Sequence, residues 1–333
     1  MTRFGDFKPL CTNTPSYPLC NLFYRQLQHS APTVLLNVSA NATSAPIGVN
    51  PKCGIARVGS ENSIGNIANI LACGLSILVT VWLIYRCNYR KAAVGRIEFR
   101  AFLAVYLVTL PLQLIATGSF LEQGTTTLVA FTAIHAGAVT ALFWMLLGNA
   151  LVATQVVEDG QPSSLIPFYV LTAFFLAATT YISLDVALTF TSTFEPGDPK
   201  DSLHSISLFI LTLIWPGVCV SLSLHSCPTY SCLTLFPVGS AALLYFILMV
   251  WIVVGVLHEM RPILYYALAG ILFIFAQLAY FLLSRTICDG TSAKIDGSFI
   301  ATALETATIV VLYFAWQRIT EDHWPDDNLY FPQ

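Results

Sequence analysis

From Ile64 onward the chain is a succession of apolar stretches long enough to cross a lipid bilayer, with almost no charge inside them. A spanning helix needs about 20 apolar residues, and residues 128–152 and 263–284 reach that length. The composition agrees, because only 10% of the residues are charged, whereas a soluble domain carries roughly 25%. The sequence therefore predicts an all-α polytopic membrane protein, a bundle of spanning helices in a lipid bilayer.

Charge predicts how this bundle is oriented. The amino terminus lacks a charged start followed by an apolar run, so we expect no cleavable signal peptide and insertion by the first spanning helix. That helix, about 64–85, is followed by a basic loop that contains Arg86, Arg90, Lys91, Arg96 and Arg100. Cytosolic loops are rich in Lys and Arg, so the loop is predicted to be cytosolic and the amino terminus lumenal. Contact with anionic lipid heads is compatible with this orientation.

Residues 1–62 carry features of the secretory lumen. Asn37-Val38-Ser39 and Asn41-Ala42-Thr43 fit the N-glycosylation sequon, which makes Asn37 and Asn41 the expected glycan sites. Cys11, Cys20 and Cys53 lie in the same segment, where disulfides are permitted. The alternative is a loose polar tail with unpaired thiols. Both features favour a lumenal amino terminus.

Residues 63–318 form the predicted transmembrane bundle, and residues 319–333 form a short acidic tail. Hydropathy marks eight candidate spans, about 64–85, 101–117, 128–152, 165–188, 203–224, 233–257, 263–284 and 299–318. If residues 217–237 do not span, about seven helices remain and the carboxyl terminus is cytosolic. Cys288 then joins the three amino-terminal cysteines in the lumen, and four cysteines allow three pairings.

No motif for catalysis, a metal or a cofactor rises above chance in this sequence, so we predict that the protein is not an enzyme and binds no cofactor. A pI of about 6.0 gives no indication of a nucleic-acid partner. Polar groups inside a membrane are costly and are candidates for function; those singled out are His135, Asn149, Asp185 and Glu305. His135 and Asn149 lie on nearly one helix face and could line a polar seam. The alternative is that each polar group makes an interhelical hydrogen bond, and Asp185 is close enough to the interface to be hydrated.

Short stretches along nearly the whole chain resemble a known family, the fungal chitin synthase export chaperones. They are FGDF at 4–7 with Cys11, PLC at 18–20, RKAAVGR at 90–96, TAIHAG at 132–137, ATQVVEDG at 153–160, TYISLD at 180–185, DGSFIAT at 296–302 and ITEDHW at 319–324. The resemblance implies a multi-pass protein of the endoplasmic reticulum that helps a chitin synthase fold and reach the cell surface. It implies a role in cell-wall chitin synthesis, a chitin synthase as membrane client and no small-molecule substrate.

The chain departs from that family at one place. In the family, the helix that carries Ile214, Trp215 and Pro216 continues almost directly into a stretch like residues 241–245, whereas residues 217–237 intervene here. The codons for Gly217-Val218, Leu233-Thr234 and Pro237-Val238 can contain the sequences of an intron donor, a branch site and an acceptor, respectively. We therefore interpret the segment as a translated, unspliced intron. The alternative is a genuine insertion that adds a span or a re-entrant loop.

Two other function classes fit a polytopic bundle. A seven-helix receptor shares the helix count and the lumenal or extracellular amino terminus, but residues 154–158 are not the acidic-Arg-aromatic triplet of that class and the last helix has no Asn-Pro-x-x-Tyr. A transporter is disfavoured because no internal repeat is recognisable. The leading hypothesis is therefore the export chaperone.

Overall fold

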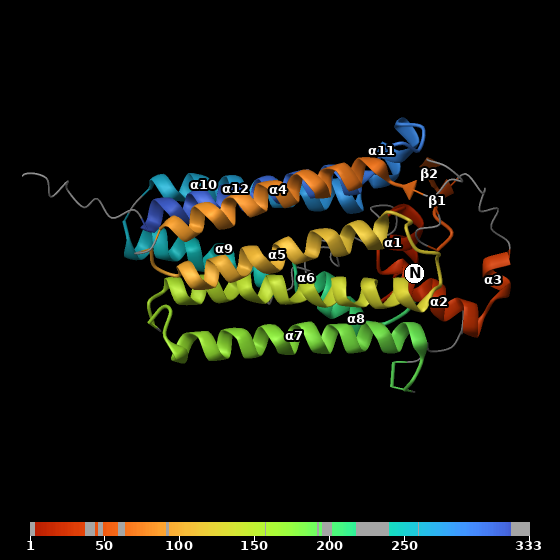
Figure 1. The fold of residues 1–333 in the computed structure, drawn as a ribbon, viewed down its shortest axis with the longest axis horizontal. Coiled ribbons are helices and arrows are strands. Elements are labelled where there is room, and N and C mark those ends of the chain that lie inside the picture. Colours follow the sequence, from red (N-terminus) through yellow and green to blue (C-terminus); the bar gives the residue numbers. More distant parts are fainter. Residues whose placement is uncertain are drawn as a thin grey trace, which may run out of the picture.

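The computed structural model is a bundle of long helices that lie roughly side by side (Figure 1). It describes residues 4–36, 44–45, 49–58, 64–90, 93–156, 158–191, 193–194, 202–217, 240–258 and 260–320. Within these residues, six helices are long and apolar enough to cross a membrane. They are α4 (Ile67–Tyr89), α5 (Arg96–Thr117), α6 (Thr126–Ala153), α7 (Pro162–Leu188), α10 (Arg261–Phe281) and α12 (Gly297–Thr320). The predicted class, an all-α polytopic membrane protein, is confirmed.

Helix boundaries follow local chemistry. Gly95, with φ of 67°, turns the chain into α5, and the Thr125 hydroxyl accepts a 3.4 Å hydrogen bond from the Leu128 N–H at the start of α6. The prediction that the second span begins near residue 101 was wrong, since α5 begins at Arg96 and takes in Arg100. Long basic side chains can extend to the interface while their backbone continues the helix.

Two shorter helical pieces lie between α7 and α10 in the sequence. The first is α8 (Ile206–Phe209), which continues through a π-helical stretch, Ile210–Ile214; the second is α9 (Ala241–Trp251), which continues through Ile252–Val256. The Ala241 N–H donates a 2.9 Å hydrogen bond to the Trp215 carbonyl, so the second piece starts where the first ends. The ranges 203–224 and 233–257, predicted as separate spans, therefore have described residues that are joined end to end. Residues 218–239 lie outside the described residues.

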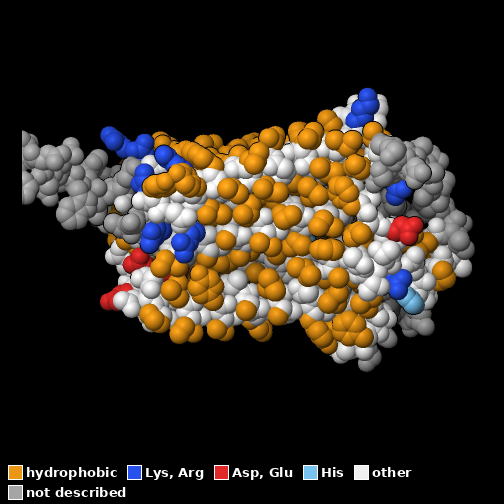
Figure 2. Space-filling view, in the orientation of Figure 1, with side chains coloured by type: hydrophobic (Ala, Val, Ile, Leu, Met, Phe, Trp, Pro, Cys, Tyr) orange, Lys and Arg blue, Asp and Glu red, His pale blue; other side chains and the backbone are white. Residues whose placement is uncertain are grey.

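The helices form a ring in which sequence neighbours are mostly spatial neighbours. α4 packs between α5 and α12, α5 packs on α6, α10 packs on α12, and α9 lies between α6 and α10. α7 packs mainly on α6 and is the least buried of the six long spans. Apolar side chains cover the middle of the face seen in Figure 2, whereas charged side chains gather at its two ends. This distribution matches a bilayer-spanning protein, because hydrocarbon does not solvate charge.

The amino-terminal segment folds against one end of the bundle (Figure 1). It contains α1 (Lys8–Asn13), α2 (Cys20–Ser30), α3 (Thr33–Leu36) and an antiparallel sheet of β1 (Ser44–Ala45), β2 (Ile55–Val58) and β3 (Ile64–Gly65) in the order β1-β2-β3. Phe7 and Phe23 are buried in one cluster with Val129 of α6, Val186 of α7 and Leu208 of α8. The segment therefore shares a hydrophobic core with the spans.

Candidate functional site

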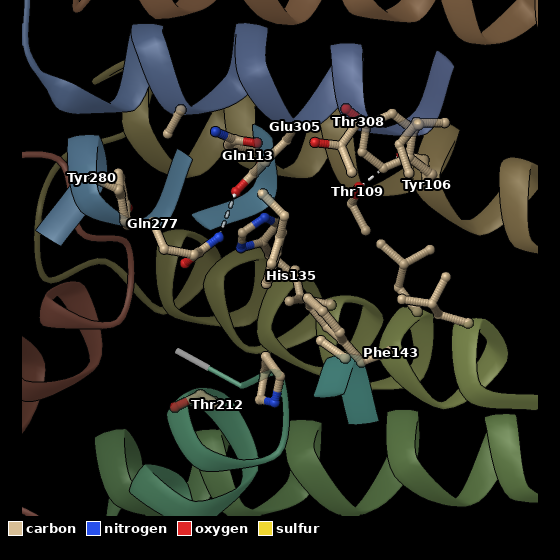
Figure 3. Close-up of a pocket in the computed structure, with 18 of the residues that line it drawn as sticks. Tyr106, Thr109, Gln113, His135, Phe143, Thr212, Gln277, Tyr280, Glu305 and Thr308 are labelled. Carbon is tan, nitrogen blue, oxygen red and sulfur yellow. Dashed lines mark hydrogen bonds between the residues drawn. The ribbon is translucent and has the colours of Figure 1, made fainter. Parts of the chain in front are cut away.

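A cavity of about 200 Å³ lies inside the bundle. Its walls come from α5, α6, α9, α10 and α12, and from Tyr17, Pro18 and Leu19 of the amino-terminal segment. Most of the lining is aliphatic or aromatic; the polar members include Tyr106, Thr109, Gln113, His135, Thr212, Gln277, Tyr280, Glu305 and Thr308 (Figure 3). Apolar walls with a few convergent polar groups are typical of a small-molecule site.

Glu305, on α12, is the acidic group of the cavity. Its Oε1 accepts a hydrogen bond of 3.3 Å from Nε2 of Gln277 on α10, drawn as a dashed line in Figure 3. Among the described lining residues there is no Lys or Arg to balance a carboxylate. The sequence singled out Glu305 because a carboxyl inside a membrane is costly; it gave no sign that Gln277 would be its partner.

His135, on α6, lines the same cavity and makes no hydrogen bond to any described residue. Figure 3 shows its imidazole turned toward the region where Gln277 meets Glu305. The expectation of one seam through His135 and Asn149 was wrong. Asn149 donates a 2.7 Å hydrogen bond to the Met145 carbonyl of its own helix and does not line the cavity. A side-chain amide can bond the carbonyl one turn earlier in its own helix and then needs no partner across the bundle.

A ladder of hydroxyl groups runs along one face of α12, where Ser298, Thr302 and Thr306 follow at intervals of four residues. Each of these three hydroxyl groups is hydrogen bonded to a residue that lies in another span or at its start. These bonds tie α12 to α4 and α5 in a medium with no water to compete. The ladder was not predicted from sequence, although the spacing of four residues is present there. The pairs are Ser298 with Asn66 (3.1 Å), Thr302 with Asn69 (3.0 Å) and Gln113 (2.9 Å), and Thr306 with Ser76 (2.6 Å) and Tyr106 (2.8 Å).

Asp296, just before α12, is a second buried acid that the sequence analysis missed. Its Oδ1 accepts hydrogen bonds from the Ser298 N–H (3.2 Å) and the Ser298 hydroxyl (2.5 Å). Burial raises the pKa of Asp296, and the hydrogen bonds from Ser16 and Ser298 oppose that rise. The carboxyl therefore lies at the start of the last span in an environment that favours its protonated form.

Asp185 is fully buried but lies outside the cavity, in the last turn of α7. Its carboxylate accepts a 2.8 Å hydrogen bond from the Thr191 N–H and a second bond from the Thr191 hydroxyl. The alternative that Asp185 is simply hydrated was wrong, because the chain after α7 folds over the side chain and supplies its donors.

The cysteines singled out by sequence meet in two pairs. Cys11 is bonded to Cys20 with Cα atoms 5.7 Å apart, and Cys53 is bonded to Cys288 with Cα atoms 6.3 Å apart. Cys288 lies on α11 (Ser284–Gly290), between the last two spans. The second pair therefore ties the amino-terminal segment to a connection 235 residues away in sequence.

The turn from α4 into α5 lies at the end of the bundle opposite the amino-terminal segment (Figure 1), and Lys and Arg side chains gather at that end of the face seen in Figure 2. The Arg86 guanidinium lies 5.6 Å from the Trp82 ring centroid, and Arg100 Nη1 donates a 3.1 Å hydrogen bond to Asn88 Oδ1. An arginine over an aromatic ring is held by the cation–π attraction while its charge stays near the interface.

The other basic residues belong to the turn between α4 and α5. Arg90 caps the end of α4, Arg96 begins α5, and Lys91 lies outside the described residues. Trp316, near the end of α12, donates a 3.0 Å hydrogen bond from its indole to the Val94 carbonyl in this turn. The carboxyl end of the last span is therefore at the same pole as the basic residues.

Glu98, buried at this pole, was not singled out by sequence as a structural group. It accepts hydrogen bonds from the Gly160 N–H (3.0 Å) and the Ser164 hydroxyl (3.4 Å), and Asp159 accepts one from the Gly95 N–H (3.0 Å). The connection between α4 and α5 and the connection between α6 and α7 are thus joined to each other. A carboxylate that receives backbone N–H groups at a helix start satisfies donors that the helix leaves open.

The fold and its buried polar groups define a class, a polytopic helical membrane protein that has a mostly apolar cavity with a few polar groups inside the bundle, and disulfides at one pole. The sequence model of the chitin synthase export chaperone family matches residues 3–227 and 222–328. The chain belongs to this family. The two matched stretches overlap at residues 222–227, which lie between α8 and α9 in the sequence.

Curated relatives agree with this assignment. The chain is 24% identical to the chitin synthase export chaperone of Aspergillus clavatus over 324 residues, which cover 96% of this chain and 83% of that protein. It is 25% identical to the one of Phaeosphaeria nodorum over 320 residues (96% and 83%), and 24% identical to the one of Neurospora crassa over 332 residues (97% and 78%). No solved structure matches the chain.

Proposed function

We propose that this protein is a chaperone of the endoplasmic-reticulum membrane that a chitin synthase requires to fold and to leave that compartment. The observation that carries this function is the family match over almost the entire chain, from residue 3 to residue 328. The role supports cell-wall chitin synthesis, because a synthase that stays in the reticulum does not deliver chitin to the wall.

The mechanism that we propose is physical contact between helices in the bilayer, without chemistry performed on the client. Polar and small residues of a client helix that lack partners in lipid can pair with helices of a chaperone. α7 is the span most open to such contact, because it packs mainly on α6 and exposes Ile166, Val170 and Phe174. The name chaperone in the relatives supports a non-enzymatic role.

For orientation, we propose a lumenal amino terminus and a cytosolic carboxyl terminus. The contact between Trp316 and Val94 supports this arrangement, since it puts the end of the last span beside the basic region that follows the first. The disulfides lie at the opposite pole, which suits the oxidising lumen. The predicted glycan sites Asn37 and Asn41 lie outside the described residues, so they remain a prediction.

For the client, the experiment is deletion of the gene with a fluorescently tagged chitin synthase followed in the same cells. We expect the synthase to remain in the endoplasmic reticulum and wall chitin to fall, while an unrelated plasma-membrane protein reaches the surface as usual. Synthase that is already at the surface should transfer sugar at its normal rate. Normal surface delivery of the synthase in the deletion strain would contradict the export role and favour the receptor alternative.

A further inference from the structure

The cavity offers an acid that has no counter-ion among the described lining residues. Glu305 receives its hydrogen bond from Gln277, and the described lining contains no Lys or Arg. A carboxyl group surrounded by apolar side chains is costly to bury unless a charged or hydrogen-bonding partner meets it. The partner that complements a carboxylate best is a cation with N–H donors.

The cavity also offers a second acceptor. His135 makes no hydrogen bond to a described residue and faces the same space as Glu305 (Figure 3). A neutral imidazole has one ring nitrogen that accepts. An ammonium group has several N–H donors, so a carboxylate and an imidazole nitrogen together can hold one ammonium.

The remaining walls suit an apolar body with a positive charge. Phe102, Tyr106, Phe143, Phe246 and Phe273 line the cavity. Aromatic faces attract cations as well as hydrocarbon, and a volume of about 200 Å³ admits a small molecule. We propose that this cavity is a binding site for a small, mostly apolar molecule that carries one protonated amine, held by Glu305 and His135.

The test uses the full-length protein in lipid nanodiscs and three probes with the same eight-carbon chain, octylamine, 1-octanol and octanoate. Native mass spectrometry counts bound probe, and thermal unfolding of the same samples reports stabilisation. We expect one octylamine per protein, bound at least about tenfold more tightly than either other probe, since only the amine can pair with the acid.

Three variants distinguish binding of octylamine in this cavity from its general partition into lipid. E305Q keeps the size of the side chain and should weaken octylamine binding about tenfold or more. The matched control is D185N, at a buried acid outside the cavity, which should leave binding unchanged. V139F fills the space from α6 while it keeps Glu305, and should exclude the probe even if E305Q fails to fold.

Equal binding of all three probes would overturn the proposal, as would octylamine binding to V139F that matches the unmodified protein. Octylamine binding to a folded E305Q at the unmodified affinity would overturn it as well. These measurements need no client, so a negative result here does not contradict the export function. A negative result of the export experiment likewise does not contradict the proposed binding site.

Discussion

The backbone N–H of Ala241 donates a 2.9 Å hydrogen bond to the carbonyl of Trp215, so the residues on either side of the segment 218–239 lie next to each other. If Gly217 were joined directly to Ser240, these two residues would stand four positions apart, which is the spacing of an α-helical hydrogen bond. A Cβ atom added to Gly217 would lie 3.1 Å from the Ser240 Cβ, and a peptide bond keeps consecutive Cα atoms about 3.8 Å apart. This geometry supports the proposal that the 217–237 segment is absent from the mature protein.

The first prediction concerns that segment. A variant that joins Gly217 directly to Ser240 should fold, with a free energy of unfolding within about 1 kcal/mol of the full chain, because closing a loop of this length costs little. It should restore synthase export in the deletion strain. Sequencing the transcript across Trp215–Gly239 checks the intron itself: messages that retain these codons throughout would favour a genuine insertion.

The second prediction concerns the disulfides. C53S with C288S should lower the free energy of unfolding by about 2–4 kcal/mol, and C11S with C20S by less, since a separation of 235 residues constrains the unfolded chain more than one of 9. Thermal unfolding in detergent measures both. Mass spectrometry without reductant on fresh extracts checks the pairing. If all four cysteines are found as free thiols, the pairing is contradicted.

The third prediction concerns the contact between α6 and α7. A Cβ added to Gly137 would lie 2.6 Å from the Leu176 carbonyl oxygen, and closer still to the Thr180 hydroxyl. G137A should therefore push α7 away and cost about 1–3 kcal/mol. G74A is the matched control, because nothing lies within 4 Å of that position, and it should be neutral or slightly stabilising. Equal stability of the two variants would show that the close approach is unimportant.

The fourth prediction concerns Asp296, whose pKa burial raises above its ordinary value of 3.8. A raised pKa means that the folded protein binds this proton more tightly than the unfolded chain does. Stability should therefore fall as the pH rises from the ordinary pKa through the raised one. D296N, which cannot ionise, should flatten this dependence. Melting temperatures recorded from acidic to neutral pH test it, and an unchanged slope in D296N would rule out this carboxyl as the source.

The fifth prediction concerns topology. Asn37 or Asn41 should carry a glycan, so that glycosidase treatment increases the mobility of the protein from microsomes, and N37Q with N41Q should migrate like the treated protein. Protease added outside intact microsomes should cut near Arg90 and leave the amino terminus protected. An amino terminus that is cut from outside, without any glycan, would reverse the orientation.

Much of the fold follows from sequence alone, because a stretch of about 20 apolar residues in a bilayer has to form a helix that satisfies its own backbone. The same physics marked His135 and Glu305, since a polar group in hydrocarbon is costly wherever it lies. The polytopic class and the polar candidates were therefore determined before any contact between helices was known.

Tertiary structure decided which groups meet. Helices such as α6 and α7 are apolar on nearly every side, so their sequences carry little information about which face points inward. Only the order of helices around the bundle brings Gln277 to Glu305. Cys53 meets Cys288 for the same reason: the contact joins residues far apart in sequence, and packing of the whole bundle determines which of them become neighbours.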